Sequence, residues 1–250
     1  MPTLQLVYTP GQLRNMDPDH FANATCVVID VLRATSVIIA GLAAGAAAFH
    51  PVRTIEEAHQ LHARESSWLM AGERDGVARP GFHFGNSPRE FTPEKVAGQH
   101  IIHTTTNGTV ALSSCARARR VLAAAFFNLS VIIAELNAAA QLDSPLYIIC
   151  AGTGKTFSHE DALVAGAIAN SLDPRHPVAS IYRSVKDNLP RYFRGTHNAR
   201  SLLRLGMEGD IDLCLQRDIW PILPVLQKDG SIIACPPTAA AESSAVAAAA

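Results

Sequence analysis

The stretch "IIHTTTNGTVAL", residues 101–112, joins an apolar run to a helix-forming tail through a polar turn. Three threonines and an asparagine form that turn: Thr104, Thr105, Thr106 and Asn107. Free backbone N–H groups at a helix start favour an anion, and Gly108 allows a close approach to the backbone. The alternative is an ordinary helix cap, for which one threonine and Asn107 are enough. Because three threonines exceed what a cap requires, the pattern favours an anion-binding turn.

The same order of apolar run, polar turn and helix occurs again at residues 27–30 and 147–155. Further apolar runs at 68–71 and 121–124 indicate strands, and residues 185–218 have the pattern of helices. Strands that alternate with helices are typical of α/β proteins. The sequence therefore predicts a three-layer α/β/α fold with a mostly parallel, or mixed, central sheet.

Three further expectations concern individual elements. A helix is predicted over residues 35–49, in which Gly41 and Gly45 allow close packing against a neighbour. The apolar run 231–234 is predicted as a last strand at the edge of the sheet. Residues 72–91 contain four glycines and two prolines, which predicts a long loop.

Length and charge restrict the class of protein. The chain has 250 residues, of which 48% are apolar and 17% charged, and its formal net charge is −1. We expect one α/β domain over residues 1–238, or two subdomains within it, and an alanine-rich tail over 239–250. Because the charge balance provides no broad basic surface, we expect no nucleic acid and no anionic lipid as partner.

Cysteine usage and hydropathy predict a cytoplasmic protein. The five cysteines contain no Cys-x-x-Cys pair, which fits a reducing compartment. The N-terminal residues lack the pattern of a signal peptide. The longest apolar run, residues 37–49, is shorter than the roughly 20 residues that span a bilayer. A small homo-oligomer is expected only because this state is common.

Polar residues follow several of the predicted strands. In open α/β sheets, ligands bind beyond the carboxyl ends of the strands. Besides the threonines, the candidates at that edge are Asp30, Arg33, Glu73, Arg74, Asn86, Ser87, Lys155, Glu160 and Asp161. Carboxylates, cations and hydroxyls along one edge are typical of a site that binds a phosphate ester together with a hard metal ion.

Each acidic candidate also has a structural interpretation. Asp30 can cap the helix that follows it, and Ser158 with Asp161 can form a capping pair at another helix start. Mg²⁺ takes only one or two protein carboxylates. Asp30 and one further acid are therefore enough; the candidates are Glu73, Glu160 and Asp161.

Four spaced motifs resemble one known family. They are "VVIDVLRATS" (27–36), "GERDG" with "GFHFGNSPREF" (72–91), "HTTTNGTVAL" (103–112) and "CAGTGKTFSHEDALVAGAI" (150–168). Their order is similar to that of the 2-phosphosulfolactate phosphatase family. The segment "GTHNARSLLRLGMEGDIDLCLQRD" (195–218) looks like the C-terminal part of that family, so the likeness covers nearly all of residues 4–235.

The resemblance implies an activity and a fold. Members of the family hydrolyse 2-phospho-3-sulfolactate to sulfolactate and phosphate with Mg²⁺, a step of coenzyme M biosynthesis, and have a three-layer α/β/α domain. The family's motif acids and anion binders fall on Asp30, Arg33, Thr35, Glu73, Asn86, Ser87, Thr104, Thr105, Thr106, Asn107, Gly108, Glu160 and Asp161.

From these positions we expect a Mg²⁺-dependent phosphomonoester hydrolase acting on a small anionic phosphate ester. The expected catalytic residues are Asp30, Arg33, Thr105 and Asn107. The expected substrate-binding residues are Thr35, Arg74, Asn86, Ser87, Thr104, Thr106 and Gly108. The expected metal ligands are Asp30, Glu73, Glu160 and Asp161. Candidates for a second anionic group of the substrate are Arg74, Arg79 and Arg183.

Two questions stay open at the level of sequence. Either water attacks phosphorus directly, or Asp30 attacks first and forms a phosphorylated intermediate. The alternative function is a non-catalytic protein that binds a nucleotide or phosphorylated metabolite through the same turns and needs no metal.

Overall fold

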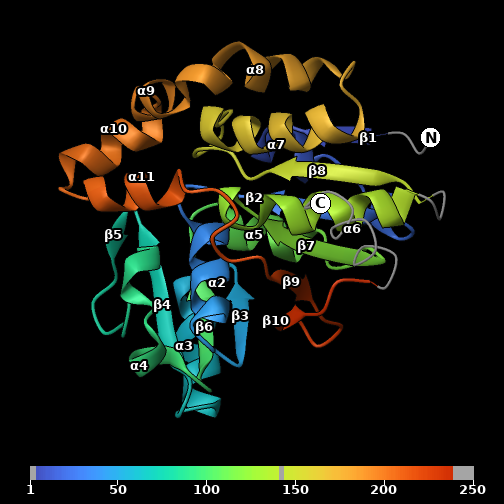
Figure 1. The fold of residues 1–250 in the computed structure, drawn as a ribbon. Coiled ribbons are helices and arrows are strands. Elements are labelled where there is room, and N and C mark those ends of the chain that lie inside the picture. Colours follow the sequence, from blue (N-terminus) through green and yellow to red (C-terminus); the bar gives the residue numbers. More distant parts are fainter. Residues whose placement is uncertain (1–3, 141–143, 239–250) are drawn as a thin grey trace.

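The computed structural model describes residues 4–140 and 144–238, and the alanine-rich tail lies outside this range. A central sheet lies between layers of helices, which confirms the predicted three-layer α/β/α class (Figure 1). Within the described residues, no helix is both long enough and apolar enough to cross a bilayer.

Among the described residues, ten strands form one mixed sheet in the order β1-β8-β2-β7-β9-β10-β3-β6-β4-β5. The strands are β1 (Leu4–Val7), β2 (Thr25–Ile29), β3 (Ala48–Val52), β4 (Leu69–Arg74), β5 (Val77–Ala78), β6 (His100–Thr104), β7 (Arg120–Ala124), β8 (Leu146–Cys150), β9 (Leu223–Leu226) and β10 (Ile232–Cys235). The strands predicted near residues 27, 68, 101, 121 and 146 are therefore confirmed as β2, β4, β6, β7 and β8.

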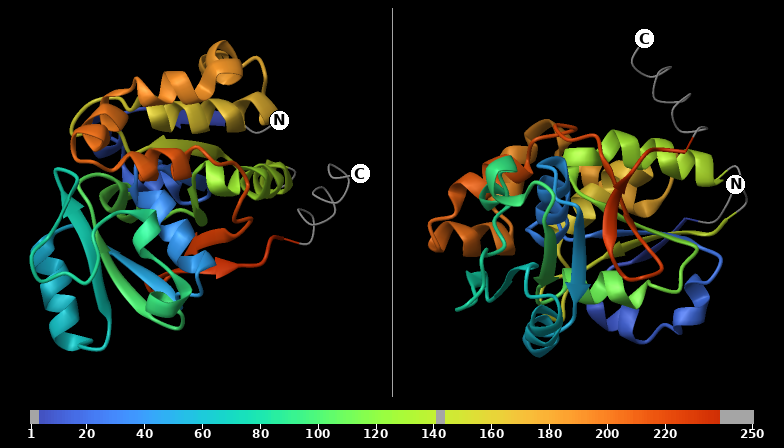
Figure 2. Two further views of the ribbon diagram at one scale, coloured as in Figure 1. Left: turned by 60° about the vertical axis from the view of Figure 1, so that its left-hand side comes forward. Right: turned by 90° about the horizontal axis from the view of Figure 1, so that it is seen from below.

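The sheet consists of two parallel groups joined by an antiparallel hairpin. One group contains β1, β8, β2 and β7, and the other contains β3, β6 and β4. The hairpin of β9 and β10 pairs antiparallel with β7 on one side and with β3 on the other (red in Figure 2). The expectation of an edge strand at 231–234 was wrong, because β10 lies inside the sheet, between β9 and β3.

Helices cover both faces of the sheet. They are α1 (Pro10–Arg14), α2 (Ala34–Ala43), α3 (Ile55–Arg64), α4 (Pro93–Val96), α5 (Gly108–Ser114), α6 (Leu129–Ala140), α7 (His159–Leu172), α8 (Pro177–Val185), α9 (Leu189–Arg194), α10 (His197–Arg204) and α11 (Glu208–Cys214). The loop predicted over 72–91 also contains the end of β4, the short strand β5 and a 3₁₀ turn at Pro88–Glu90.

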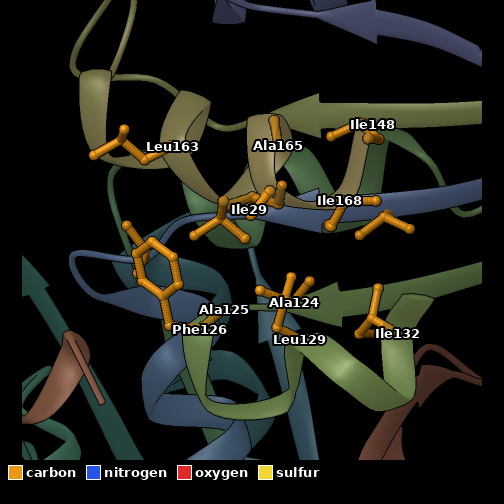
Figure 3. Packing of buried hydrophobic residues seen from close by; sticks show 14 of the residues in the cluster. Ile29, Ala124, Ala125, Phe126, Leu129, Ile132, Ile148, Leu163, Ala165 and Ile168 are labelled. Carbon is orange, nitrogen blue, oxygen red and sulfur yellow. The ribbon is translucent and has the colours of Figure 1, made fainter. Parts of the chain in front are cut away.

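The central strand β2 is buried on both faces, as its apolar sequence predicts. Val27 and Ile29 pack in the hydrophobic cluster that contains residues of α6 and α7 (Figure 3). Cys26 and Val28 point to the other face, into the cluster that contains residues of α1, α2 and α5. The carboxyl end of β2, and with it Asp30, is thereby fixed between two packed layers.

The helix predicted over residues 35–49 is shorter in the structure. α2 ends at Ala43, Gly45 adopts a left-handed conformation with φ of 92°, and residues 48–52 form strand β3. Glycine favours this conformation because it has no Cβ, and it commonly terminates helices. The expected close packing at Gly41 is confirmed, since a Cβ there would lie 2.4 Å from Cζ of Phe49.

We predict that Gly41→Ala destabilises the protein by about 1–3 kcal/mol, because the added methyl overpacks against Phe49 and outweighs the gain in helix propensity. Gly11→Ala in α1 is the matched control, because a Cβ there meets only Oγ1 of Thr9, at 3.8 Å. Urea denaturation of both variants measures the difference. Equal free energies of unfolding for the two variants would contradict this account of the α2–β3 contact.

Candidate functional site

The candidate site lies where the carboxyl ends of both parallel groups meet. Figure 1 shows that the group containing β2 and the group containing β4 run at a steep angle to each other, and that both lead toward α11. The polar turns therefore converge from two groups of strands rather than along the edge of one parallel sheet. Helices α8 to α11 arch from α7 to this meeting point and cover it (Figure 1).

A cavity of about 380 Å³ opens at this point. The predicted site residues that line it are Asp30, Arg33, Glu73, Asn86, Thr106 and Asn107. Residues of α10 close the cavity from the other side; among them are His197, Asn198 and Ser201. The structure thus brings together the first turn, the long loop and the threonine turn, as the sequence predicts.

Asp30 follows β2 directly and is held by backbone donors. Its Oδ1 accepts a hydrogen bond from Ala34 N at 3.2 Å, and the N–H of Gly108 donates to the same carboxylate. A Cβ at Gly108 would lie 2.6 Å from Asp30 Oδ2, so only glycine allows this approach. Burial and the nearby charge of Glu73 raise the pKa of Asp30 to about 7, against the lowering effect of these donors and of Arg33.

Glu73 is held mainly by the threonine turn. Its Oε1 accepts hydrogen bonds from both the N–H and the hydroxyl of Thr106, each at 3.0 Å. Its Oε2 accepts one from Gly76 N at 2.8 Å. The donors of the turn therefore fix two protein carboxylates: Thr106 holds Glu73, and Gly108 holds Asp30.

The three threonines have different roles. Thr105 is buried and exchanges hydrogen bonds with Thr109. The N–H of Thr109 donates to Thr105 Oγ1 at 3.1 Å, so Thr105 caps the start of the helix. Thr104 is also buried, and its hydroxyl accepts a hydrogen bond from Arg74 Nη2 at 3.0 Å. Only Thr106 of the three lines the cavity. Asn107 makes no side-chain capping hydrogen bond, so the helix-cap interpretation holds for Thr105 and not for Asn107. Anion binding by the turn stays a prediction.

Asp161 ties the first turn to the third. Its Oδ1 accepts from Val31 N and its Oδ2 from Gly152 N, both at 3.0 Å. Asn107 adds a second tie, because its Nδ2 donates to the carbonyl oxygen of Gly152 at 2.8 Å. Burial and the charge of Asp30 raise the pKa of Asp161. Its contacts fix the geometry around Asp30.

Glu160 holds α10 over the cavity. Its Oε1 accepts from Asn198 N at 3.0 Å and from Ala199 N at 3.4 Å, at the start of α10. Its Oε2 accepts from the hydroxyl of Ser158 at 3.0 Å. The predicted helix cap at Ser158 is confirmed, because its Oγ accepts from Asp161 N at 3.2 Å. Glu160 is 1% exposed and does not line the cavity.

Arg33 reaches the cavity wall as one half of a buried ion pair. Its Nη1 lies 2.6 Å from Oδ2 of Asp210, and its Nη2 donates to the carbonyl oxygen of Gly76 at 3.0 Å. The other carboxylate oxygen of Asp210 accepts from the hydroxyl of Ser87 at 2.7 Å. Ser87 therefore acts on Arg33 through Asp210. Sequence reasoning missed Asp210, which lies in the C-terminal segment of the resemblance and has no local signal of its own.

Asn86 is oriented by His103. The distance between Asn86 Oδ1 and His103 Nε2 is 3.0 Å, and Asn86 lines the cavity. Burial lowers the pKa of His103 to about 3. The imidazole is therefore neutral near pH 7, and its Nε2–H donates to Asn86. The amide NH₂ of Asn86 remains as a donor for a ligand.

Several expected residues lie outside the cavity lining. Thr35 is fully buried, and its hydroxyl donates to the carbonyl oxygens of Asp30 and Ala124 at 2.9 and 2.8 Å. Arg183 of α8 donates to Asn170 and to the carbonyl oxygen of Pro174, at the end of α7 remote from the cavity. The other expected residues outside the lining are Arg74, Arg79, Ser87, Thr104, Thr105, Gly108, Glu160 and Asp161.

The carboxylate pair Asp30 and Glu73 is the part of the cavity that fits a metal ion. Within residues 4–140 and 144–238, no three or more His, Cys, Asp or Glu residues gather as metal ligands. A pair of carboxylates fits Mg²⁺, which keeps several water ligands.

Comparison with known proteins identifies relatives of this chain. The family model described as 2-phosphosulpholactate phosphatase matches residues 12–229. A Thermotoga maritima protein named "Probable 2-phosphosulfolactate phosphatase" is 39% identical over 208 residues, which cover 81% of this chain and 88% of that protein. Proteins with the same name from Symbiobacterium thermophilum and a Cyanothece species are 38% and 32% identical, over 88% and 91% of this chain and 98% and 97% of their own lengths.

We predict that the buried His103 makes stability depend on pH. Its pKa is about 3 in the folded protein and about 6.5 in the unfolded chain. Below pH 6.5 only the unfolded state binds the proton, so His103 lowers the free energy of unfolding by about 1.4 kcal/mol per pH unit as pH falls.

Urea denaturation between pH 7 and pH 5 measures this slope. His103→Gln is the comparison, because glutamine keeps a donor for Asn86 and does not titrate. The wild type is expected to lose more stability than the variant on acidification. Parallel pH profiles for the two proteins would show that His103 titrates normally.

Proposed function

Because the chain belongs to the 2-phosphosulfolactate phosphatase family, we propose that it hydrolyses 2-phospho-3-sulfolactate to sulfolactate and phosphate with the help of Mg²⁺. The family assignment makes the protein a phosphoric monoester hydrolase. The observation that carries the finer proposal is the pair of carboxylates, Asp30 and Glu73, that lines one cavity together with Arg33.

Asp30 and Glu73 would hold the metal ion. Both line the cavity, and the pKa of Asp30 is raised by burial and by the neighbouring Glu73, a repulsion that a divalent cation relieves. Two carboxylates are the number that Mg²⁺ commonly takes from a protein. Bound Mg²⁺ would neutralise phosphate charge and polarise the phosphoryl oxygens.

Arg33 and Asn86 would bind the phosphate group. The guanidinium of Arg33 is fixed by Asp210 and by the carbonyl oxygen of Gly76, so it is oriented before the substrate arrives. His103 engages Oδ1 of Asn86 and leaves its NH₂ for a phosphate oxygen. Each such donor contributes about 10²–10³ in rate when it is aimed at charge that develops in the transition state.

Hydrolysis would form a bond from a water oxygen to phosphorus and break the phosphorus–oxygen ester bond. The water gives up one proton and the departing alkoxide takes up one, so the reaction is balanced. The cavity residues orient the phosphate for this displacement. Helix α10 covers the reacting group, because Glu160 holds its first turn in place. His197 and Ser201 on that helix line the same cavity, and they would contact the part of the substrate that carries the carboxylate and the sulfonate.

We predict that Asp30→Asn lowers phosphate release by about 10³-fold, because both direct attack by water and attack by Asp30 require this carboxylate. The assay is release of phosphate from 2-phosphosulfolactate and from p-nitrophenyl phosphate, with Mg²⁺ and with EDTA. Asp229→Asn, on the exposed turn between β9 and β10, is the control and retains activity. Near wild-type turnover by Asp30→Asn would show that Asp30 has no role in the reaction. Turnover that persists in EDTA would show that Mg²⁺ is not required. If the wild type binds phosphate esters without hydrolysing them, the alternative function, a non-catalytic binding protein, is supported instead.

We predict that Glu73→Gln and Glu160→Gln separate metal binding from support of α10. Glu73→Gln raises the Mg²⁺ concentration at half-maximal activity by about 10-fold or more, because a metal ligand is lost. Glu160→Gln lowers the melting temperature and leaves the Mg²⁺ requirement close to that of the wild type, because its carboxylate caps α10. The reverse pattern would assign Glu160 to the metal and Glu73 to structure. Mg²⁺ titrations and thermal melts of both variants provide the comparison.

A further inference from the structure

A second cavity, of about 690 Å³, lies on α8, α9 and α10 beside the catalytic cavity. We call it the basic groove. Three arginines and two histidines line it: Arg191, Arg200, Arg204, His159 and His197. The other residues of its lining are uncharged, and Tyr192 contributes an aromatic ring.

The charge of the basic groove is not neutralised by nearby acids. Residues 183–204 contain six arginine and lysine residues and one aspartate. Arg194, which lies outside the groove, takes Glu208 and Asp212 as its ion-pair partners. In the described part of the chain, neither Arg191 nor Arg200 forms an ion pair, and both are exposed.

Helix α10 separates the basic groove from the catalytic cavity and contributes to both. His197, Arg200 and Arg204 line the groove, at the spacing of three and four residues that places side chains on one helix face. Asn198 and Ser201 line the cavity. His197 belongs to both linings, so the two spaces meet at the first turn of α10.

The two spaces differ in charge in a way that matters for an anionic ligand. The catalytic cavity presents Asp30, Glu73 and Asp75, and Arg33 in its wall is already paired with Asp210. A substrate with phosphate, carboxylate and sulfonate groups is repelled by these carboxylates until it reaches the metal ion. The groove offers unpaired guanidinium groups beside this cavity, and its volume is typical of small-molecule sites.

We propose that the basic groove is a second binding site for small polyanions that carry phosphate or sulfonate groups, and that it captures the substrate beside the catalytic cavity. Arginine fits this role because its planar guanidinium binds phosphate and sulfonate oxygens in pairs and stays charged at all relevant pH values. Capture of the substrate rests on the proposed function, whereas binding of polyanions in the groove does not. Clefts of one charge raise association rates by about 10–10³-fold at low ionic strength.

Binding is tested with inorganic sulfate, which is not a product of the proposed reaction. Isothermal titration calorimetry without divalent cations compares the wild type with the double variant Arg191→Gln/Arg200→Gln. The control is Arg64→Gln/Arg175→Gln, which removes the same charge from exposed positions outside both cavities. The groove variant is expected to bind sulfate at least tenfold more weakly, and the control to bind like the wild type. If sulfate binding weakens equally in both variants, or in neither, the proposed site in the basic groove is contradicted.

Capture is tested by steady-state kinetics with 2-phosphosulfolactate and saturating Mg²⁺. The groove variant is expected to lose about tenfold in kcat/KM at low ionic strength, with kcat unchanged, and the loss is expected to shrink near 0.15 M salt because screening increases. An unchanged kcat/KM overturns capture even if sulfate binding is lost. Sulfate binding by a wild type that hydrolyses no phosphate ester leaves the site intact and contradicts only the proposed function. Melting temperatures of both variants confirm that they are folded.

Discussion

The burial of several carboxylates at one place is the constraint on which the site depends. A buried carboxylate is unfavourable unless hydrogen bonds or cations compensate its charge. The chain provides each with a partner: backbone N–H groups for Asp30 and Asp161, the threonine turn for Glu73, and Arg33 for Asp210. Asp30 retains a raised pKa in spite of its donors. The geometry is therefore prepared for a further positive charge, which the proposed metal ion provides.

The strands were predictable where an apolar run ends in a polar turn, as at β2, β6 and β8. Other elements depended on contacts that the sequence does not display. β3 follows α2 within one alanine-rich run, and only the left-handed Gly45 and pairing with β6 and β10 separate strand from helix. The sequence of β10 is an ordinary short apolar run, and its place inside the sheet is set by pairing with β3 on one side and with β9 on the other.

The residue types of the site were predictable, and their partners were not. The threonine turn was expected to present donors to a bound anion, and its donors hold Glu73 and Asp30, which lie far away along the chain and cannot be identified from local sequence. Asp210 neutralises Arg33 although the two lie 177 residues apart in the sequence, and Glu160 holds α10 through Asn198, which lies 38 residues away. Such links come from the convergence of two strand groups, which no local pattern specifies. The same holds for the basic groove, whose arginines gather only when α9 and α10 pack side by side.

The central claim is that Asp30 and Glu73 together hold the metal ion that binds the phosphate. Crystals soaked with Mn²⁺ and inorganic phosphate, measured near the manganese absorption edge, locate that ion directly. The account predicts one anomalous peak at bonding distance from both carboxylates, with the phosphate between the ion and Arg33. A peak at Glu160, or at any position away from Asp30, would contradict it.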